Sequence, residues 1–452
     1  MMKQYRAASR NHIHSIGAIM PARFLSLLLL ALLSAGSLPA QVHKGTFALK
    51  GARIETVTHG TIDRGTLIIR DGRIAALGAD VAIPGDAEVI DCAGLTLYPG
   101  MIDAGTQLGL VEIGSQPEAR DDDELGEVTP QVQALTAVNP NSVEIPVTRV
   151  NGVTTALTFP GGGLFPGTAA VINLLGYTPA QMQVGSFRGV VMNFPSSGRD
   201  GEYDDRSDED IEKSVAKGKK RLKDVWESAV LYSRIDSAYS ADGAGKPPPE
   251  YLPELIALAP VVRGTVPLLI EVNAARDIDS ALAWVKEHRV KAIFTGVSEG
   301  WRLADRIAAA GIPCIVGPVL TIPGRASDRY DKAYANPGLL QAAGVKVALR
   351  TAEAANVRNL PYQAGFAVAY GMGKDEALRA VTINTARIFG IDSLLGSLEV
   401  GKQATLFAAD GDPFEPTTHV QKLFIDGYMV PLESRHVELY KEFLKRVPGV
   451  TK

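Results

Sequence analysis

The sequence predicts an α/β protein in which a closed (β/α)₈ barrel is joined to a small β-sandwich domain. In residues 99–397, short apolar runs such as Pro267–Val272 alternate with helix-like stretches such as Ile278–Glu287. This alternation is typical of a parallel sheet covered on both faces, and its length favours an eight-stranded barrel. Short β-branched strands occupy residues 41–98 and 398–440, on either side of the barrel region. We therefore expect one sandwich domain built from both ends of the chain.

Residues 1–40 are predicted to be a secretory signal peptide. Arg23 precedes the apolar run Phe24–Ala35, and the segment closes on the small residue Ala40. A basic flank, an apolar stretch of about 7–15 residues and a small residue before the cut define such a peptide. A retained membrane anchor is the alternative, although spanning a bilayer takes about 20 apolar residues. The prediction is an exported protein, located in a bacterial periplasm or secreted.

Charge and cysteine content exclude several classes of protein. Residues 1–40 hold four of the 46 basic residues and no acidic one, so the remainder has 42 basic and 50 acidic residues and a net charge of −8. This balance argues against a nucleic-acid or anionic-membrane partner. The two cysteines, Cys92 and Cys314, are too few for a disulfide framework. We expect two buried thiols, and a single bridge stays open.

Charged segments interrupt the barrel region and end the chain. Residues 186–250 are predicted to be an insertion that contains a charged helix over Ile211–Tyr232, and residues 441–452 a C-terminal tail. The acidic stretch Glu118–Glu127 follows the first barrel strand. Such a charge run is ordinarily a solvated loop. A binding lid is the alternative, because loops at this face of a barrel carry function.

Motifs near both ends of the barrel region are similar to those of a known family. Leu97–Gly109 (LYPGMIDAGTQLG) resembles a first-strand signature that usually reads Pro-Gly-x-Ile-Asp-x-His-x-His. Ala377–Gly390 (ALRAVTINTARIFG), Gly396–Lys402 and Asp410–Pro413 resemble a last helix and closing strands. The family is the amidohydrolase superfamily, in particular its imidazolonepropionase-like members, and the resemblance covers residues 48–430. It implies a TIM barrel that hydrolyses non-peptide C–N bonds, amide or cyclic amide, with a divalent metal, usually zinc.

The metal ligands that this resemblance implies are missing. Such a site needs three or more His or Asp donors and an open position for a water whose pKa the metal lowers. Gly105 and Gln107 occupy the places of the two first-strand histidines. Glu271, Gly296 and Ala352 stand where the family has two further histidines and an aspartate general base. One acidic side chain in five positions cannot form the site, so we expect no cofactor.

The histidine positions support this conclusion without an alignment. Beyond residue 40 the histidines are His43, His59, His288, His419 and His436. The first two belong to the N-terminal β part, and the last two to the C-terminal appendage. His288 ends a helix that precedes a strand, which places it at the opposite face of the barrel. We expect none of them at the barrel mouth.

Two other groups have both a functional and a structural interpretation. Gly296–Gly300 (GVSEG) matches the G-x-S-x-G pattern around Ser298. A serine hydrolase would need a later histidine base, and a tight turn of small residues also explains the pattern. Arg350, Asn356 and Arg358 follow the eighth strand and can bind an anion such as a carboxylate, or they cap and fix the loop.

Two further groups of residues also have a possible binding role that the sequence leaves open. Gly161–Gly163 can present backbone donors to an oxyanion, or it is a plain flexible loop. Glu271, with Asp103 and Glu299, can bind a hard cation such as Ca²⁺ through carboxylate oxygens.

Three functions follow from these observations. The first is an amidohydrolase-like barrel that binds a small-molecule ligand or an active paralogue, as a homo- or hetero-oligomer, without metal-dependent turnover. Its mouth, lined by Gly105, Gln107, Gly296 and Ala352, would be open and uncharged compared with a metal site. The second is a working hydrolase of non-peptide C–N bonds that uses a rearranged set, such as Glu271 with Asp103. A structural envelope protein is the third, since fold does not fix function.

Overall fold

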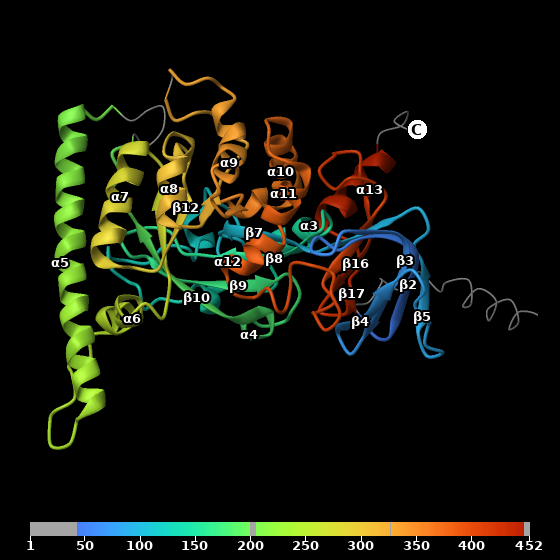
Figure 1. Ribbon diagram of the computed structural model, residues 1–452, viewed down its shortest axis with the longest axis horizontal. Helices are drawn as coiled ribbons and strands as arrows, with labels where there is room; N and C mark the ends of the chain where they lie inside the picture. Colours follow the sequence, from blue (N-terminus) through green and yellow to red (C-terminus); the bar gives the residue numbers. More distant parts are fainter. Residues whose placement is uncertain (1–42, 199–204, 326, 447–452) are drawn as a thin grey trace, which may run out of the picture. The chain divides into compact units, whose positions relative to one another are not determined.

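The computed structural model describes residues 43–198, 205–325 and 327–446 (Figure 1). The predicted signal peptide at residues 1–40 lies outside these residues. The described residues belong to one unit of the chain and contain two hydrogen-bonded sheets. Within this part of the chain, no helix combines the length and the apolar character that crossing a membrane requires.

The first sheet confirms the predicted eight-stranded barrel. Its edges meet where the backbone N–H of Ala352 donates to the carbonyl oxygen of Gly105 at 3.0 Å. The strands follow one another in chain order: β7 (Met101–Thr106), β8 (Val153–Thr158), β9 (Gly167–Asn173), β10 (Gln183–Asn193), β11 (Leu268–Val272), β12 (Ala292–Gly296), β13 (Cys314–Val316) and β14 (Val347–Leu349).

One barrel strand runs against the others. β9 pairs antiparallel with both β8 and β10, whereas the remaining neighbours pair in parallel. Its connections hold only turns and the short helix α4 (Pro179–Met182), and a parallel crossover needs about a dozen residues or more. The start of the predicted insertion is wrong, because residues 186–193 belong to β10.

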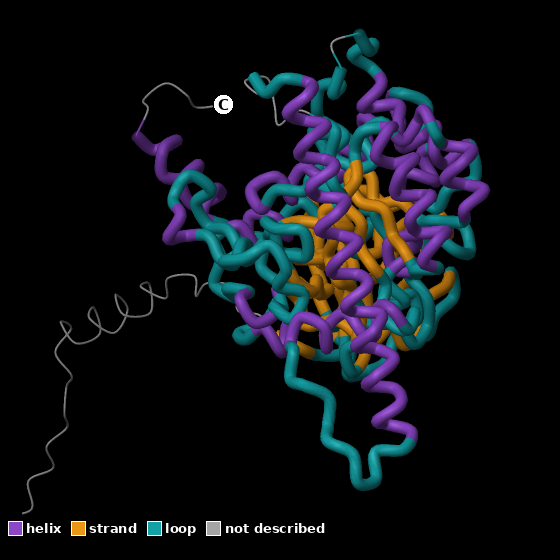
Figure 2. The backbone as a smooth tube through the Cα atoms, turned by 90° about the vertical axis from the view of Figure 1, so that its left-hand side faces the viewer, coloured by secondary structure: helices purple, strands orange, loops and turns teal. Residues whose placement is uncertain are grey.

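Helices surround the barrel strands (Figure 2). In α7 the buried positions Ile278, Ala281, Leu282 and Val285 recur every three or four residues, which turns one face of the helix to the sheet. The helices are α2 (Ala134–Ala137), α3 (Glu144–Arg149), α5 (Asp208–Ala241), α6 (Pro253–Val262), α7 (Ala275–His288), α8 (Ala304–Ala310), α9 (Lys332–Ala342), α10 (Leu360–Ala369), α11 (Lys374–Ala380) and α12 (Ile383–Ile388).

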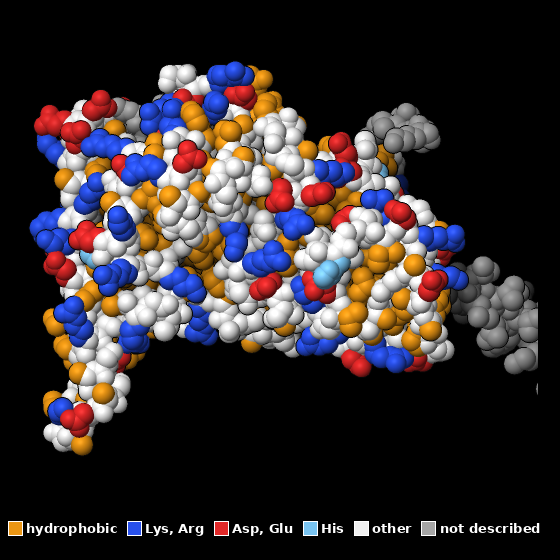
Figure 3. Space-filling model, in the orientation of Figure 1, with side chains coloured by type: hydrophobic (Ala, Val, Ile, Leu, Met, Phe, Trp, Pro, Cys, Tyr) orange, Lys and Arg blue, Asp and Glu red, His pale blue; other side chains and the backbone are white. Residues whose placement is uncertain are grey.

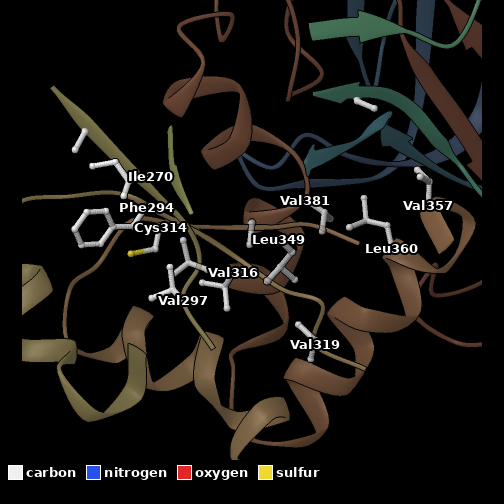
Figure 4. Close-up of a cluster of buried hydrophobic side chains, with 14 of the residues drawn as sticks. Ile270, Phe294, Val297, Cys314, Val316, Val319, Leu349, Val357, Leu360 and Val381 are labelled. Atoms are coloured by element: carbon white, nitrogen blue, oxygen red, sulfur yellow. The ribbon is translucent and has the colours of Figure 1, made fainter. Parts of the chain in front are cut away.

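Apolar side chains on the outward face of consecutive barrel strands pack against the surrounding helices. Ile270, Phe294, Cys314, Val316 and Leu349 come from β11, β12, β13 and β14 and gather in one cluster (Figure 4). All five are at most 2% exposed. The inserted helix α5 is also fixed to this body, because its Trp226 packs edge-to-face on Trp284 of α7 with ring centroids 5.0 Å apart.

The second sheet joins the two ends of the described chain. Phe47 of β2 and Phe424 of β16 lie with ring centroids 5.2 Å apart, although two strands separate them in the sheet order. Neighbouring strands lie about 4.8 Å apart, so this contact requires the sheet to curl over its own core. The order is β1 (His43–Lys44), β17 (Tyr428–Met429), β16 (Val420–Ile425), β15 (Leu406–Ala409), β6 (Thr96–Pro99), β2 (Phe47–Glu55), β3 (Thr61–Arg70) and β4 (Arg73–Gly78), with β5 (Glu88–Asp91) beside β2.

Two further sequence predictions can be compared with the structure. Cys92 and Cys314 are both buried and free, as expected. Residues 441–446 do not form a tail, because they complete the helix α13 (Arg435–Arg446).

Candidate functional site

A cavity of about 260 Å³ opens at the barrel mouth. It lies at the C-terminal ends of the parallel strands, where barrel enzymes carry their sites. Four of the five sequence-predicted family positions line it, namely Gly105, Gln107, Glu271 and Ala352. The other lining residues are Ala104, Leu157, Phe159, Pro160, Gly161, Gly162, Val191, Asn193, Leu269, Thr295, Arg350 and Glu353.

An ion pair between Glu271 and Arg350 occupies this mouth. Glu271 is in β11 and Arg350 directly follows β14, so the two charges reach the cavity from different strands. Nη1 of Arg350 donates to Oε2 of Glu271 at 2.7 Å, and Nη2 donates to Oε1 at 2.8 Å. The side chains are 7% and 25% exposed, in the order Arg350 and Glu271. A bidentate pair of this kind fixes both groups in orientation as well as in charge.

Neighbouring groups complete the hydrogen bonds of Glu271 and add one to Arg350. Oε2 of Glu271 also accepts from the Thr295 hydroxyl at 2.5 Å, and Oε1 accepts from the Asn273 amide at 2.9 Å. Nε of Arg350 donates to the carbonyl oxygen of Gly317 at 3.1 Å. Burial acts to raise the pKa of Glu271, but the charge of Arg350 and these hydrogen bonds outweigh burial and lower it. Glu271 is therefore held as an anion and is a weak base.

Two glycines leave the space that the ion pair fills. A Cβ at Gly105 would lie 3.2 Å from Cδ of Arg350, and a Cβ at Gly296 would lie 2.5 Å from Oε1 of Glu271 and 2.4 Å from Oδ1 of Asn273. Gly296 also has a φ of +81°, a conformation that side chains rarely adopt. A histidine at Gly296 is therefore incompatible with the present arrangement of Glu271, and a histidine at Gly105 would require the Arg350 side chain to move.

Asp103 lies beneath the mouth and does not line the cavity. It is fully buried in β7 and accepts from the backbone N–H groups of Gly105 at 2.9 Å and Thr351 at 3.3 Å, and from the Thr351 hydroxyl at 2.5 Å. These bonds join the first and last barrel strands. Burial raises the pKa of Asp103 to about 6, against the bonds and the charge of Arg350, which lower it. Its position gives it a role in barrel closure.

The acidic stretch after the first strand is partly built into the site. Asp122 is 1% exposed and accepts from Nε2 of Gln107 at 2.6 Å and from Nε and Nη2 of Arg120 at 3.1 and 3.0 Å. Its carbonyl oxygen accepts the N–H of Gly161 at 2.6 Å. Asp122 thus ties this loop to the rim of the cavity.

The predicted anion-binding group does not converge. Only Arg350 lines the cavity, where Glu271 already neutralises it. Asn356 donates to Oε2 of Glu353 at 2.7 Å, and Nη1 of Arg358 lies 3.6 Å from Oε2 of Glu144.

The three carboxylates that were predicted to bind a hard cation, Glu271, Asp103 and Glu299, do not converge on one site either. Glu299 accepts from the N–H of Ala275 and from Nη2 of Arg325, both at 2.7 Å. It therefore has partners of its own, as do Glu271 and Asp103.

The Ser298 hydroxyl donates to the carbonyl oxygen of Asn273 at 3.4 Å, and no histidine with a described side chain lines the cavity. His288 instead packs on Trp284 with ring centroids 4.8 Å apart.

The residues at the mouth do not fit the metal ion that this type of barrel implies. Gly105, Gly296 and Ala352 offer no side-chain donor, and Glu271 is engaged by a guanidinium whose charge repels a divalent cation. In the described ranges, no three His, Cys, Asp or Glu side chains are placed to hold a metal ion.

Comparisons with known proteins agree with the fold. A sequence profile described as "Amidohydrolase family" matches residues 325–430. A crystal structure of an amidohydrolase from Thermotoga maritima MSB8 is similar with a TM-score of 0.74 and 25% identity, over 85% of this chain and 99% of that one.

Two curated proteins are similar over short segments. The dihydroorotase of Mycobacterium tuberculosis is 44% identical over 50 residues, which is 11% of this chain and 12% of that protein. The imidazolonepropionase of a Bradyrhizobium species is 50% identical over 52 residues, 11% of this chain and 13% of that protein. The matches thus span a small part of both relatives. Fold and site position define an amidohydrolase-type barrel. The profile match, the short imidazolonepropionase match and the similar crystal structure support a place in the amidohydrolase superfamily.

Several site residues were missed from sequence. Thr295, Asn193 and Glu353 were not singled out, and Asp122 was taken only as part of a charge run. One signal was present, because Glu271 and Arg350 are opposite charges at the ends of two apolar strands of one barrel. Residues at such positions converge on the mouth.

Proposed function

We propose that this chain is an exported amidohydrolase-like barrel that binds a ligand or partner at its mouth and performs no metal-dependent hydrolysis. One observation carries the proposal: the guanidinium of Arg350, paired with Glu271 at 2.7 and 2.8 Å, is seated against Gly105 at the mouth of the barrel. A fixed cation there takes the role of charge partner to Glu271 that a metal would otherwise have.

The pairing also disfavours a rearranged hydrolase that uses Glu271 and Asp103. A general base must accept a proton near the working pH, but both oxygens of Glu271 already accept two hydrogen bonds each and its pKa is lowered. Asp103 lies out of reach of a ligand, since it is fully buried and does not line the cavity. Ligand binding without turnover is the function that these contacts support best.

The test is an assay of the purified protein with a cyclic amide such as dihydrouracil, without and with EDTA or added Zn²⁺. We expect no turnover under any of these conditions. Turnover that EDTA abolishes would overturn the proposal. Turnover that survives EDTA but is lost in Glu271→Gln would instead establish the rearranged hydrolase.

Export and association are parts of the same proposal. Export rests on the pattern of residues 1–40, and we expect the protein in the periplasmic fraction with an N-terminus near residue 41. Cell fractionation followed by N-terminal sequencing measures both, and recovery of an uncleaved chain in the membrane fraction would contradict this.

Basic and acidic side chains are interspersed on the face in Figure 3, which agrees with the expectation of no nucleic-acid partner.

Homo- or hetero-oligomerisation, including pairing with an active paralogue, stays a prediction. Light scattering of the purified protein measures homo-oligomerisation, and co-purification from the native host measures pairing with a paralogue.

A further inference from the structure

The cavity at the barrel mouth offers hydrogen-bond acceptors that have no partner in the described parts of the chain. Gln107 uses its amide nitrogen on Asp122, which leaves its Oε1 free. Asn193 uses its amide nitrogen on the carbonyl oxygens of Gly162 and Gly163, at 2.6 and 2.8 Å, which leaves its Oδ1 free. Both amides are oriented by these donor bonds, so two carbonyl oxygens remain for a ligand.

The charges that line the cavity sum to a negative value. Among the described residues, Arg350 is the one cationic side chain in the lining, and Glu271 neutralises it. Glu353 is an exposed carboxylate whose Oε2 accepts from Asn356, and within the described residues its Oε1 has no partner. The described part of the lining therefore holds one uncompensated negative charge, that of Glu353.

The remaining wall of the cavity is apolar. Leu157, Phe159 and Leu269, with Ala104, Pro160 and Val191, supply this surface. A volume of about 260 Å³ is below the range of about 300–1,000 Å³ that is common for drug-sized ligands. The cavity thus suits a ligand with a compact apolar body, such as a single ring.

We propose that the barrel mouth binds a small organic cation, a primary ammonium group carried on an apolar body. An ammonium group has three N–H donors and no acceptor, and the cavity offers three acceptors in Gln107, Asn193 and Glu353. A carboxylate ligand would bring further acceptors to a lining already rich in them. This inference rests on the proposed function, because a metal at the mouth would reverse the charge of the site.

Three probes of similar shape but different charge test the inference: 2-phenylethylammonium, 2-phenylethanol and phenylacetate. Their affinities for the purified protein are measured by ligand-observed NMR at neutral pH. We expect the ammonium compound to bind about tenfold more tightly than the alcohol, as a charge-assisted hydrogen bond provides, and phenylacetate to bind least. Equal affinities, tightest binding of phenylacetate, or no binding of the ammonium compound at millimolar concentration overturns the inference.

A pair of variants assigns the effect to the cavity. Glu353→Gln should weaken binding of 2-phenylethylammonium about tenfold and leave 2-phenylethanol unchanged, because it removes charge with little change in shape. Glu415→Gln, an exposed carboxylate that does not line the cavity, is the matched control and should change neither affinity. An equal loss in both variants contradicts the assignment. If the protein contains no metal and the order of affinities is reversed, the inference fails while the proposed function stands.

Discussion

Arg350 and Glu271 face one another across the barrel mouth, with Nη1–Oε2 and Nη2–Oε1 distances of 2.7 and 2.8 Å. Members of this superfamily are expected to hold a divalent cation in this region, and here a guanidinium is the cation next to the carboxylate. The relationship accounts for the small residues around it, because Gly105 and Gly296 leave no room for larger side chains beside the pair.

Breaking one side of this pair should destabilise the protein more than removing both sides. Glu271→Leu or Arg350→Met alone leaves a largely buried charge without its partner, which costs about 3 kcal/mol, while the double variant leaves none. Urea unfolding of the wild type, the two single variants and the double variant gives the coupling free energy between Glu271 and Arg350. The exposed pair Arg53–Asp63 is the control and should show coupling close to zero. Additive losses at Glu271 and Arg350 would show that the pair is not coupled.

The buried carboxyl of Asp103 should make stability depend on pH with a specific sign. Its pKa is raised from 3.8 to about 6 by burial, so its contribution is fully present below about pH 4 and is lost as the pH rises through about 6. Relative to Asp103→Asn, which cannot ionise, the wild type should lose about 3 kcal/mol between pH 4 and pH 7. Unfolding free energies measured at both pH values test this, and a constant difference contradicts it.

A single methyl group at position 296 should disturb the site. Gly296→Ala places a Cβ 2.4 Å from Oδ1 of Asn273 in a left-handed conformation, so strain and overlap add to about 3 kcal/mol. Gly311→Ala has a similar φ of +66° but open space around its Cβ, so it should cost only about 1 kcal/mol. Thermal unfolding compares the two, and equal losses would remove the steric explanation.

Asp122 should control the order of the loop at the rim of the cavity. Asp122→Ala removes the acceptor for Gln107 and Arg120, so hydrogen exchange of residues 117–127 should rise by about tenfold or more. Asp121→Ala changes an exposed neighbour and should leave exchange in the loop unchanged. If both variants behave alike, the buried contacts of Asp122 do not hold the loop.

The barrel fold could be predicted from the sequence, but the direction in which one of its strands pairs could not. Apolar runs and the motif around Leu97–Gly109 indicated the barrel and its position, since both are local in sequence. The reversal of β9 was missed because an apolar run has the same pattern in either direction, and only the short connections to β8 and β10 reveal it.

The candidate site could be predicted as a set of positions but not as a set of contacts. Gly105, Gln107, Glu271 and Ala352 were expected at the mouth, and the structure brings them to one cavity. The partner of Arg350 could not be predicted from spacing, because Glu271 lies 79 residues earlier and on another strand. The expectation of an uncharged mouth is wrong for the same reason, since the ion pair was not foreseen.

The metal content of the purified protein tests the central claim most directly. The full chain is produced, freed of any affinity tag and analysed by plasma mass spectrometry for zinc, manganese, iron, cobalt and nickel. Because the Arg350 guanidinium holds Glu271 and no histidine with a described side chain lines the mouth, we predict less than about 0.1 metal ion per chain. A content near one zinc ion per chain that is lost with EDTA, together with loss of hydrolysis, would contradict the account.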